Sequence, residues 1–309
     1  MDWTSWLLST VSRALAFGVP LLWATLGEIY AERAGVVNLG VEGMMILGAF
    51  TAFAVAQSTG RPGLGLFCAA MVGGVAALVH AFLTVTLRAN QYVSGLALSM
   101  FGLGLAGLLG RGWEGKPLSA TLPYLTIPGL ARIPVLGPML FYDQTLLTYL
   151  GLVLALLLWL LLFRTRWGVA IRSVGENPAT ADSLGINVVL VRYMCVVFGG
   201  LLAGVAGGYL SVAYRPAWTE GMTAGMGWIV IALTIFAAWD PLQAIWGAFF
   251  FGALYHLSYR LQAFLAPELL KLMPYLFAVL VLAASGFGGA RWRRRAPAAL
   301  GVPYVRGER

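Results

Sequence analysis

Charged side chains are scarce in this sequence. Only 10% of its 309 residues are Asp, Glu, Lys or Arg, whereas 60% are hydrophobic. A soluble domain carries about 25% charged residues, so this chain lacks the polar surface that a water-facing protein needs. The shortage excludes an ordinary soluble fold for most of the chain and predicts that it is embedded in a lipid bilayer.

The residues that catalysis and metal binding use are also few. The chain has 2 histidines and 2 cysteines, and it contains no His-Glu-x-x-His zinc motif and no Gly-x-Ser-x-Gly nucleophile elbow. We expect His80 and His256 to be satisfied inside the helix bundle, and Cys68 and Cys195 to pack within apolar runs. The sequence therefore predicts no metal site and no cofactor of its own, and it assigns no enzymatic chemistry.

Two glycine-rich stretches resemble nucleotide-binding motifs but lack what those motifs require. The stretch 110–117 has Pro117 where a P-loop has the Ser or Thr that holds magnesium. Gly102, Gly104 and Gly107 match the dinucleotide fingerprint but fall inside an apolar run, where small residues let helices pack closely. We infer that the chain does not itself hydrolyse ATP. Its net charge of +8 does not indicate nucleic acid, because Lys and Arg collect on the cytoplasmic loops of membrane proteins.

Long apolar runs are what the sequence does contain. A helix that crosses about 30 Å of hydrocarbon needs about 20 apolar residues. A run from Ala14 towards Ala31 is interrupted by Glu28, and eight charge-free runs reach or nearly reach the required length. These eight are 43–60, 62–87, 89–110, 144–163, 193–214, 221–239, 241–259 and 272–290. The sequence predicts an all-α polytopic helical membrane protein with about nine transmembrane helices, within a range of eight to ten, and one transmembrane domain over residues 1–309.

The distribution of basic residues predicts the orientation of these spans. Four arginines between 291 and 295 directly follow the last span, so we expect a basic cytoplasmic tail over residues 291–309. Counting back through nine spans puts the 164–192 loop in the cytoplasm as well. In this arrangement 12 of the 20 basic residues lie on the cytoplasmic side, in agreement with the positive-inside rule.

A faint internal symmetry links the third and eighth spans. Pro62 opens a span that reaches Ala-Leu-Val-His80, and Pro241 opens one that reaches Ala-Leu-Tyr-His256. These spans lie five apart and therefore cross the membrane in opposite directions. Many transporters are built from an inverted repeat of this kind, although four matched letters also arise by chance.

Several polar side chains within the apolar runs are candidates for a translocation path. If a span starts near Ala34, Asn38 and Glu42 share one helix face, and Glu42 lies about 12 Å into the bilayer. A carboxylate at that depth costs about 2.5–3.5 kcal/mol, so it faces other helices or a water-filled path. A hydrogen-bonded pair that only packs helices is an equal alternative. The expected path-lining residues are Asn38, Glu42, Asn90, Gln91 and Trp228.

The sharpest local signal lies in the 164–192 loop. Asn177 suits a helix N-cap, Pro178 suits the first helical position, and Gly185 suits the C-terminal cap. These signals predict a short helix over 176–185. One interpretation is an ordinary loop helix, and the other is a docking element that a membrane subunit offers to a soluble motor.

Four stretches of the chain resemble a known family of transporters. The stretch 31–50, Ala-Glu-Arg-Ala-Gly-Val-Val-Asn-Leu-Gly-Val-Glu-Gly-Met-Met-Ile-Leu-Gly-Ala-Phe, is similar to the signature of ABC-importer permeases for nucleosides and simple sugars. The other three stretches are 88–95, 175–187 and 220–225. The chain looks closest to the shorter permease of nucleoside importers that a lipoprotein receptor feeds, and those systems resemble the ribose and branched-chain amino acid importers.

This resemblance implies a permease subunit of an ATP-driven importer, with ATP bound by a separate ATPase subunit. It further implies a second homologous permease, which forms a heterodimer with this chain around a central path, and a substrate-binding lipoprotein. The 176–185 helix would be the coupling helix that contacts the ATPase through Glu176, Asn177, Pro178, Ala181, Asp182 and Gly185. The expected substrate is a nucleoside, and a simple sugar of the ribose type is the alternative.

A third hypothesis is an ion-coupled secondary carrier, which would work without an ATPase. The usual mark of such carriers is a cluster of intramembrane carboxylates at broken helices. Only Glu42 meets that description in this sequence. The sequence therefore favours the ATP-driven importer.

Overall fold

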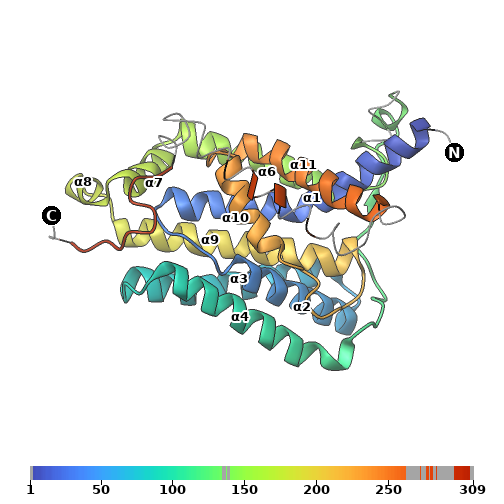
Figure 1. Cartoon of the computed structure of the whole chain (residues 1–309), viewed down its shortest axis with the longest axis horizontal. Coiled ribbons are helices and arrows are strands. Elements are labelled where there is room, and N and C mark those ends of the chain that lie inside the picture. Colours follow the sequence, from blue (N-terminus) through green and yellow to red (C-terminus); the bar gives the residue numbers. More distant parts are fainter. Residues whose placement is uncertain are drawn as a thin grey trace.

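The computed structural model of the chain describes residues 3–133, 137, 140–261, 272, 276–277, 279–280, 283 and 296–306. Long helices run side by side along one axis (Figure 1). Six described stretches are long and apolar enough to cross a membrane, namely Ser12–Arg33, Val41–Thr59, Pro62–Thr86, Gln91–Trp113, Leu146–Arg164 and Val188–Tyr214. The structure therefore confirms an all-α polytopic membrane protein.

Most of the described helices follow one another with short connections, but residues 111–145 separate α4 from α6. The α-helices are α1 (Trp3–Arg33), α2 (Val41–Thr59), α3 (Pro62–Ala81), α4 (Gln91–Gly110), α6 (Leu146–Arg164), α7 (Arg166–Glu176), α8 (Pro178–Ser183), α9 (Val188–Tyr209), α10 (Met226–Phe236) and α11 (Pro241–Leu261). The π-helical turns η1 (Phe82–Thr86) and η4 (Leu210–Tyr214) extend α3 and α9. Two 3-10 turns are η2 (Arg111–Trp113) and η3 (Leu130–Arg132). The strands β1 (Tyr124–Leu125) and β2 (Gln144–Thr145) pair antiparallel, with Tyr124 opposite Thr145.

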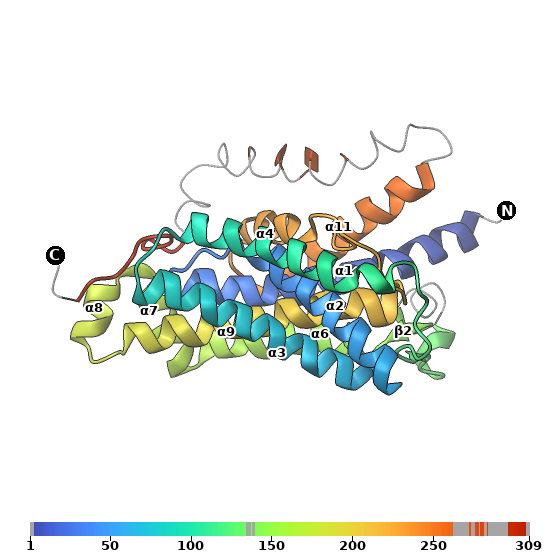
Figure 2. The same cartoon turned by 90° about the horizontal axis from the view of Figure 1, so that it is seen from below.

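The two ends of the bundle carry different elements. α7, α8 and the C-terminal segment 296–306 lie together at one end, which we call the α8 end (Figures 1 and 2). The start of α1 and the β1–β2 pair lie at the opposite end, which we call the strand end. The chain therefore gathers the short helices α7 and α8 and the segment 296–306 at one end of the bundle.

The described residues leave the count of nine spans untested. The run 221–239 holds only the 11-residue helix α10, because irregular chain occupies residues 215–225 before it. Left-handed backbone at Gly221, Ala224 and Gly225 prevents a helix there. α11 is long enough, with 21 residues, but it is not among the six apolar spans. The run 272–290 lies largely outside the described residues.

Glycines let the helices of the bundle approach closely. α9 packs on α1, α2 and α3. A Cβ atom added to Gly27 of α1 would lie 2.8 Å from the carbonyl oxygen of Gly199 in α9, so the two backbones touch. In lipid the hydrophobic effect does not drive helices together, so such close packing is a main source of helix–helix stability.

Two glycine-to-valine substitutions test this packing. A Cβ on Gly204 of α9 would lie 2.9 Å from the backbone carbonyl carbon of Ala69, and backbone cannot yield as a flexible side chain can. Gly104 of α4 has nothing within 4 Å of its added Cβ. Overpacking costs about 1–3 kcal/mol or more, so we expect Gly204→Val to reduce folded protein and its melting temperature in detergent, while Gly104→Val changes neither. Equal melting temperatures for the two variants would contradict the packing.

Candidate functional site

α1 ends at Arg33, and a glycine cap closes it. Gly35 has φ +87°, and its N–H donates to Glu32 O at 2.8 Å. The N–H of Val36 donates to Ala31 O at 3.1 Å. These two bonds form a Schellman cap, which needs a residue such as glycine in the left-handed region. Residues 34–40 therefore leave the helix.

Asn38 keeps the chain non-helical up to α2. Its Oδ1 accepts a hydrogen bond from Gly40 N at 3.0 Å, so the side chain replaces a helical backbone bond. α2 begins only at Val41. The prediction that Asn38 and Glu42 share one helix face was wrong, because a local turn separates them.

The 34–40 segment turns back into the bundle. Asn38 N donates to Glu28 Oε1 at 3.2 Å. Glu28 lies five residues before Arg33, the last residue of α1, which is about 7.5 Å along the helix axis. α2 consequently starts beside α1 within the bundle and not at its end. Irregular backbone at membrane depth must find its hydrogen-bond partners in the protein.

Side chains of α3 and α4 supply those partners. Gln91 Oε1 accepts from Val37 N at 2.7 Å. The Nε2 of His80 lies 3.0 Å from Val37 O, and its Nδ1 lies 3.0 Å from Ser94 Oγ. His80 and Gln91 are both buried. The expectation of a satisfied bundle histidine is confirmed for His80.

Glu42 joins the start of α2 to the start of α10, an arrangement we call the Glu42 clamp. Its Oε1 accepts from Thr223 Oγ1 at 2.5 Å and from Gly225 N at 3.0 Å. Its Oε2 accepts from Gly227 N at 2.6 Å. The carboxylate is 3% exposed and satisfies N–H groups that the first turn of a helix leaves free. The two non-helical breaks, 34–40 and 215–225, are thus connected through one side chain.

The other two expected path residues lie elsewhere. Asn90 is exposed and caps α4, since its Oδ1 accepts from Tyr92 N at 3.0 Å and from Val93 N at 3.1 Å. Trp228 follows Gly227 in α10 and is 38% exposed. The structure therefore places Asn38 and Gln91 at the 34–40 segment, Glu42 and Trp228 at the start of α10, and Asn90 at the exposed start of α4.

The short helix expected over 176–185 is α8, which covers Pro178–Ser183. Asn177 Oδ1 accepts from Thr180 N at 3.0 Å, so the predicted N-cap is confirmed. Gly185 has φ +83°, and its N–H donates to Asp182 O at 2.9 Å in a second Schellman cap. Glu176 belongs instead to the end of α7, because the extended backbone of Asn177 separates the two helices.

Leu184 is a candidate that the sequence analysis passed over. It follows α8 directly and is 74% exposed. α8 lies at the outer edge of the α8 end (Figure 1), and the exposed side chain of Leu184 follows it directly. Capping signals identified the helix, but exposure of one leucine cannot be read from local sequence.

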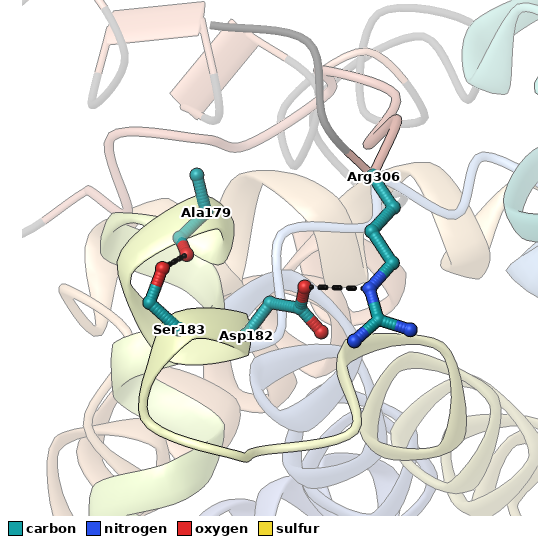
Figure 3. A network of polar contacts seen from close by, with 4 residues as sticks. All are labelled: Ala179, Asp182, Ser183 and Arg306. Carbon is teal, nitrogen blue, oxygen red and sulfur yellow. Dashed lines mark hydrogen bonds and ion pairs between the residues drawn. The ribbon is translucent and has the colours of Figure 1, made fainter.

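The C-terminal segment reaches α8. Asp182 Oδ2 accepts from Arg306 Nε at 3.0 Å, and Ser183 Oγ donates to Ala179 O at 3.0 Å (Figure 3). The pKa of the nearby Tyr304 hydroxyl is raised, first by partial desolvation and then by the Asp182 carboxylate. The tyrosine therefore stays neutral beside the ion pair.

Comparisons with known proteins identify the family of the chain. The family described as branched-chain amino acid transport system / permease component matches residues 10–283. The guanosine ABC transporter permease protein NupQ of Bacillus subtilis is 39% identical and covers 100% of both chains. The nucleoside ABC transporter permease protein NupC of Lactococcus lactis subsp. cremoris is 34% identical over 96% of both. A putative glucose ABC transporter permease of Haloferax volcanii is 37% identical over 93% of this chain and 94% of its own. No solved structure matches the chain significantly.

These findings define the class of the protein. It is a permease subunit of an ABC importer, a multi-pass protein of the plasma membrane that transports and is not itself an enzyme. The chain belongs to the family of branched-chain amino acid transport system permease components. The ion-coupled secondary carrier considered from the sequence is thereby set aside.

Proposed function

We propose that this permease carries nucleosides into the cell. The observation that carries the proposal is the 39% identity to a guanosine permease over the whole of both chains. The 34% identity to a nucleoside permease over 96% of both chains adds support. Similarity to a putative glucose permease at 37% identity supports the alternative, a simple sugar.

Uptake of radiolabelled uridine, adenosine and ribose tests the substrate. Cells with and without the gene are compared at the same expression of the partner subunits. We expect nucleoside uptake to fall without the gene while ribose enters normally. Loss of ribose uptake alone, with both nucleosides unaffected, would replace the nucleoside by the sugar.

The proposed assembly has three kinds of protein partner. The chain pairs with a second homologous permease as a heterodimer, and a substrate-binding lipoprotein delivers the substrate. A separate ATPase binds ATP, so the permease needs no cofactor of its own. Membership of an ABC permease family supports an ATPase and a substrate-binding protein. The lack of a complete nucleotide motif in the sequence supports ATP binding on another chain.

The proposed path runs beside the two breaks in the helices. Asn38, Glu42 and Gln91 act by holding those breaks in position, because their polar atoms bind backbone groups of the chain itself. Trp228, which is partly exposed next to the clamp, is the aromatic side chain best suited to contact a nucleobase. Asn90, the remaining expected path residue, caps α4 directly before Gln91.

An inverted repeat is the proposed basis of this arrangement. α1, α2 and α3 correspond to α9, α10 and α11. α1 packs on α11 as α9 packs on α3, and both α2 and α10 follow a non-helical segment. Glycine occupies the N-cap of each, Gly40 for α2 and Gly225 for α10. Such paired breaks near the membrane midplane are where transporters of this architecture bind substrate.

The α8 end is proposed to face the cytoplasm, with the 164–192 coupling loop and the 291–309 tail. Arg33 ends α1, Arg164 ends α6, and Arg88 follows α3 and its π-helical turn at this end. In cells, an impermeant thiol reagent should label Ser119→Cys from outside and Ser183→Cys only after lysis, in a background without Cys68 and Cys195. External labelling of both positions would contradict this orientation.

A further inference from the structure

The C-terminal segment 296–306 is seated against the bundle. Ala299 N donates to Gly175 O in α7 at 2.8 Å. Gly301 N donates to Gly35 O, in the turn that ends α1, at 3.2 Å. The sequence predicted a basic cytoplasmic tail without any such contacts, and we call the docked segment 296–306 the strap.

A buried arginine makes a third attachment. The sequence analysis assigned Arg192 to the 164–192 loop, but α9 begins at Val188 and Arg192 lies inside it with 1% exposure. Its Nε donates to Ala34 O at 3.2 Å, and its Nη1 donates to Val302 O at 3.2 Å. One guanidinium therefore bridges the end of α1 and the strap.

The strap lies in close contact with Gly175 and Gly35. A Cβ added to Gly175 would lie 3.3 Å from Pro297 Cβ and 2.9 Å from the carbonyl carbon of Arg33. A Cβ added to Gly35 would lie 3.2 Å from Ala299 O. All three distances are tighter than ordinary van der Waals contact, so the strap packs against Gly175 and Gly35 where a larger residue would not fit.

The strap connects two parts of the molecule that are otherwise linked only indirectly. α8 itself packs mainly on α7 and α9. Arg306 of the strap holds Asp182 of α8, while Gly301 holds Gly35, where the 34–40 segment begins. From there the chain runs directly to Glu42.

We propose that the strap is a tie that carries movement of α8 to the 34–40 segment, with Arg192 as its positioning residue. When α8 shifts, the strap pulls on the Gly35 turn, and the turn moves the start of α2 together with the Glu42 clamp. The strap stays attached throughout the transport cycle. This inference rests on the proposed function of α8 as the helix that docks on the ATPase.

Three variants test the tie in the reconstituted importer. One ends the chain after residue 295, one is Ala299→Pro, which removes the N–H that binds Gly175 O, and one is Arg192→Met, which removes the bridge. We expect each variant to insert and to bind the ATPase normally, but to move at least fivefold less substrate per ATP hydrolysed. Arg309→Ala, a change in the same tail beyond the strap, is the matched control and should behave as wild type. Wild-type transport per ATP in the truncated protein would overturn the tie.

Charge exchange examines the link to α8 without any large loss of packing. Arg306→Asp and Asp182→Arg should each lower transport about two- to fivefold, since exposed ion pairs are weak. The double variant, which restores the pair with its charges reversed, should recover most of that loss. Additive losses in the double variant would contradict a direct link.

Cross-linking the strap to the bundle tests whether it stays attached during transport or has to detach. Ala298 N lies 3.4 Å from Glu176 Oε2, so Glu176→Cys and Ala298→Cys can be joined by a short thiol-specific cross-linker. We expect cross-linked protein to transport at the rate of the same variant without linker. Loss of transport that is reversed by cleaving the linker would overturn the proposal.

A further variant separates failure of the tie from failure of the docking role. Leu184→Glu should abolish ATPase binding if α8 is the docking helix. If it binds the ATPase normally, the proposed function of α8 fails. If it loses binding while the strap variants transport normally, only the tie fails.

Discussion

Replacing Glu42 by alanine is expected to abolish transport and to destabilise the permease. The substitution leaves three donors without their acceptor: Thr223 Oγ1, Gly225 N and Gly227 N. An unsatisfied buried donor costs about 1–3 kcal/mol, so the total loss is on the order of 3 kcal/mol or more. Water cannot replace the carboxylate readily, because Glu42 is 3% exposed. Uptake in cells and thermal unfolding in detergent measure the two effects.

Glu114→Ala is the matched control for this prediction. Glu114 also accepts from a backbone N–H through both oxygens, from Glu220 N at 2.9 and 3.2 Å, but it does so at an exposed site. Water takes over its role there, so we expect a change within about 0.5 kcal/mol, as for most surface substitutions. Glu42→Gln, which retains one acceptor oxygen, should fall between the two. If Glu42→Ala had the same melting temperature and transport rate as Glu114→Ala, the result would contradict a role of the Glu42 clamp in stability and transport.

Local signals explain what the sequence could predict. The length of the apolar runs identified α2, α3, α4, α6 and α9 as spans, because the backbone in lipid must form its hydrogen bonds within a helix. Cap residues identified α8, since Asn177 and Gly185 act on their own neighbours in the chain. Both kinds of signal depend only on residues that lie within about 20 positions of one another in the sequence.

The breaks in the helices could not be predicted in the same way. Hydrophobicity continues with little interruption from Ala34 into α2, so composition places a helix across the 34–40 segment. The non-helical backbone there is stabilised by hydrogen bonds to side chains of distant elements, such as Gln91 in α4 and His80 in α3. Sequence patterns identified Glu42 as unusual but assigned it the wrong local geometry.

The strap shows a similar limit. Its terminal position is typical of a solvated tail, and the arginines before it set the expected orientation. Its contacts join residues far apart in the chain, as in the bond from Arg192 to Val302. Arg192 looked like a loop residue because its partners are backbone carbonyls, which leave no mark on the sequence.

Four of the six residues expected to contact the ATPase serve the fold of the permease itself. Asn177, Pro178 and Gly185 shape α8, and Ala181 is buried against the bundle. None of these presents a large side chain outward for a partner. Leu184 does, since it is 74% exposed. We therefore expect the contact with the ATPase to depend on Leu184 more than on the capping residues that revealed the helix.

Replacing Leu184 by glutamate is accordingly expected to weaken ATPase binding severely. Burial of a leucine side chain by a partner contributes about 2 kcal/mol, and its loss is roughly 30-fold in Kd. Uptake should fall nearly to the level without the gene, while insertion is unchanged because the side chain contacts little of the permease. Binding of the purified ATPase to proteoliposomes measures the effect. Val169→Glu makes the same kind of change at a side chain of α7 that is 52% exposed, and it should bind the ATPase as wild type. Equal affinities for the Leu184→Glu variant and wild type would move the docking contact away from α8.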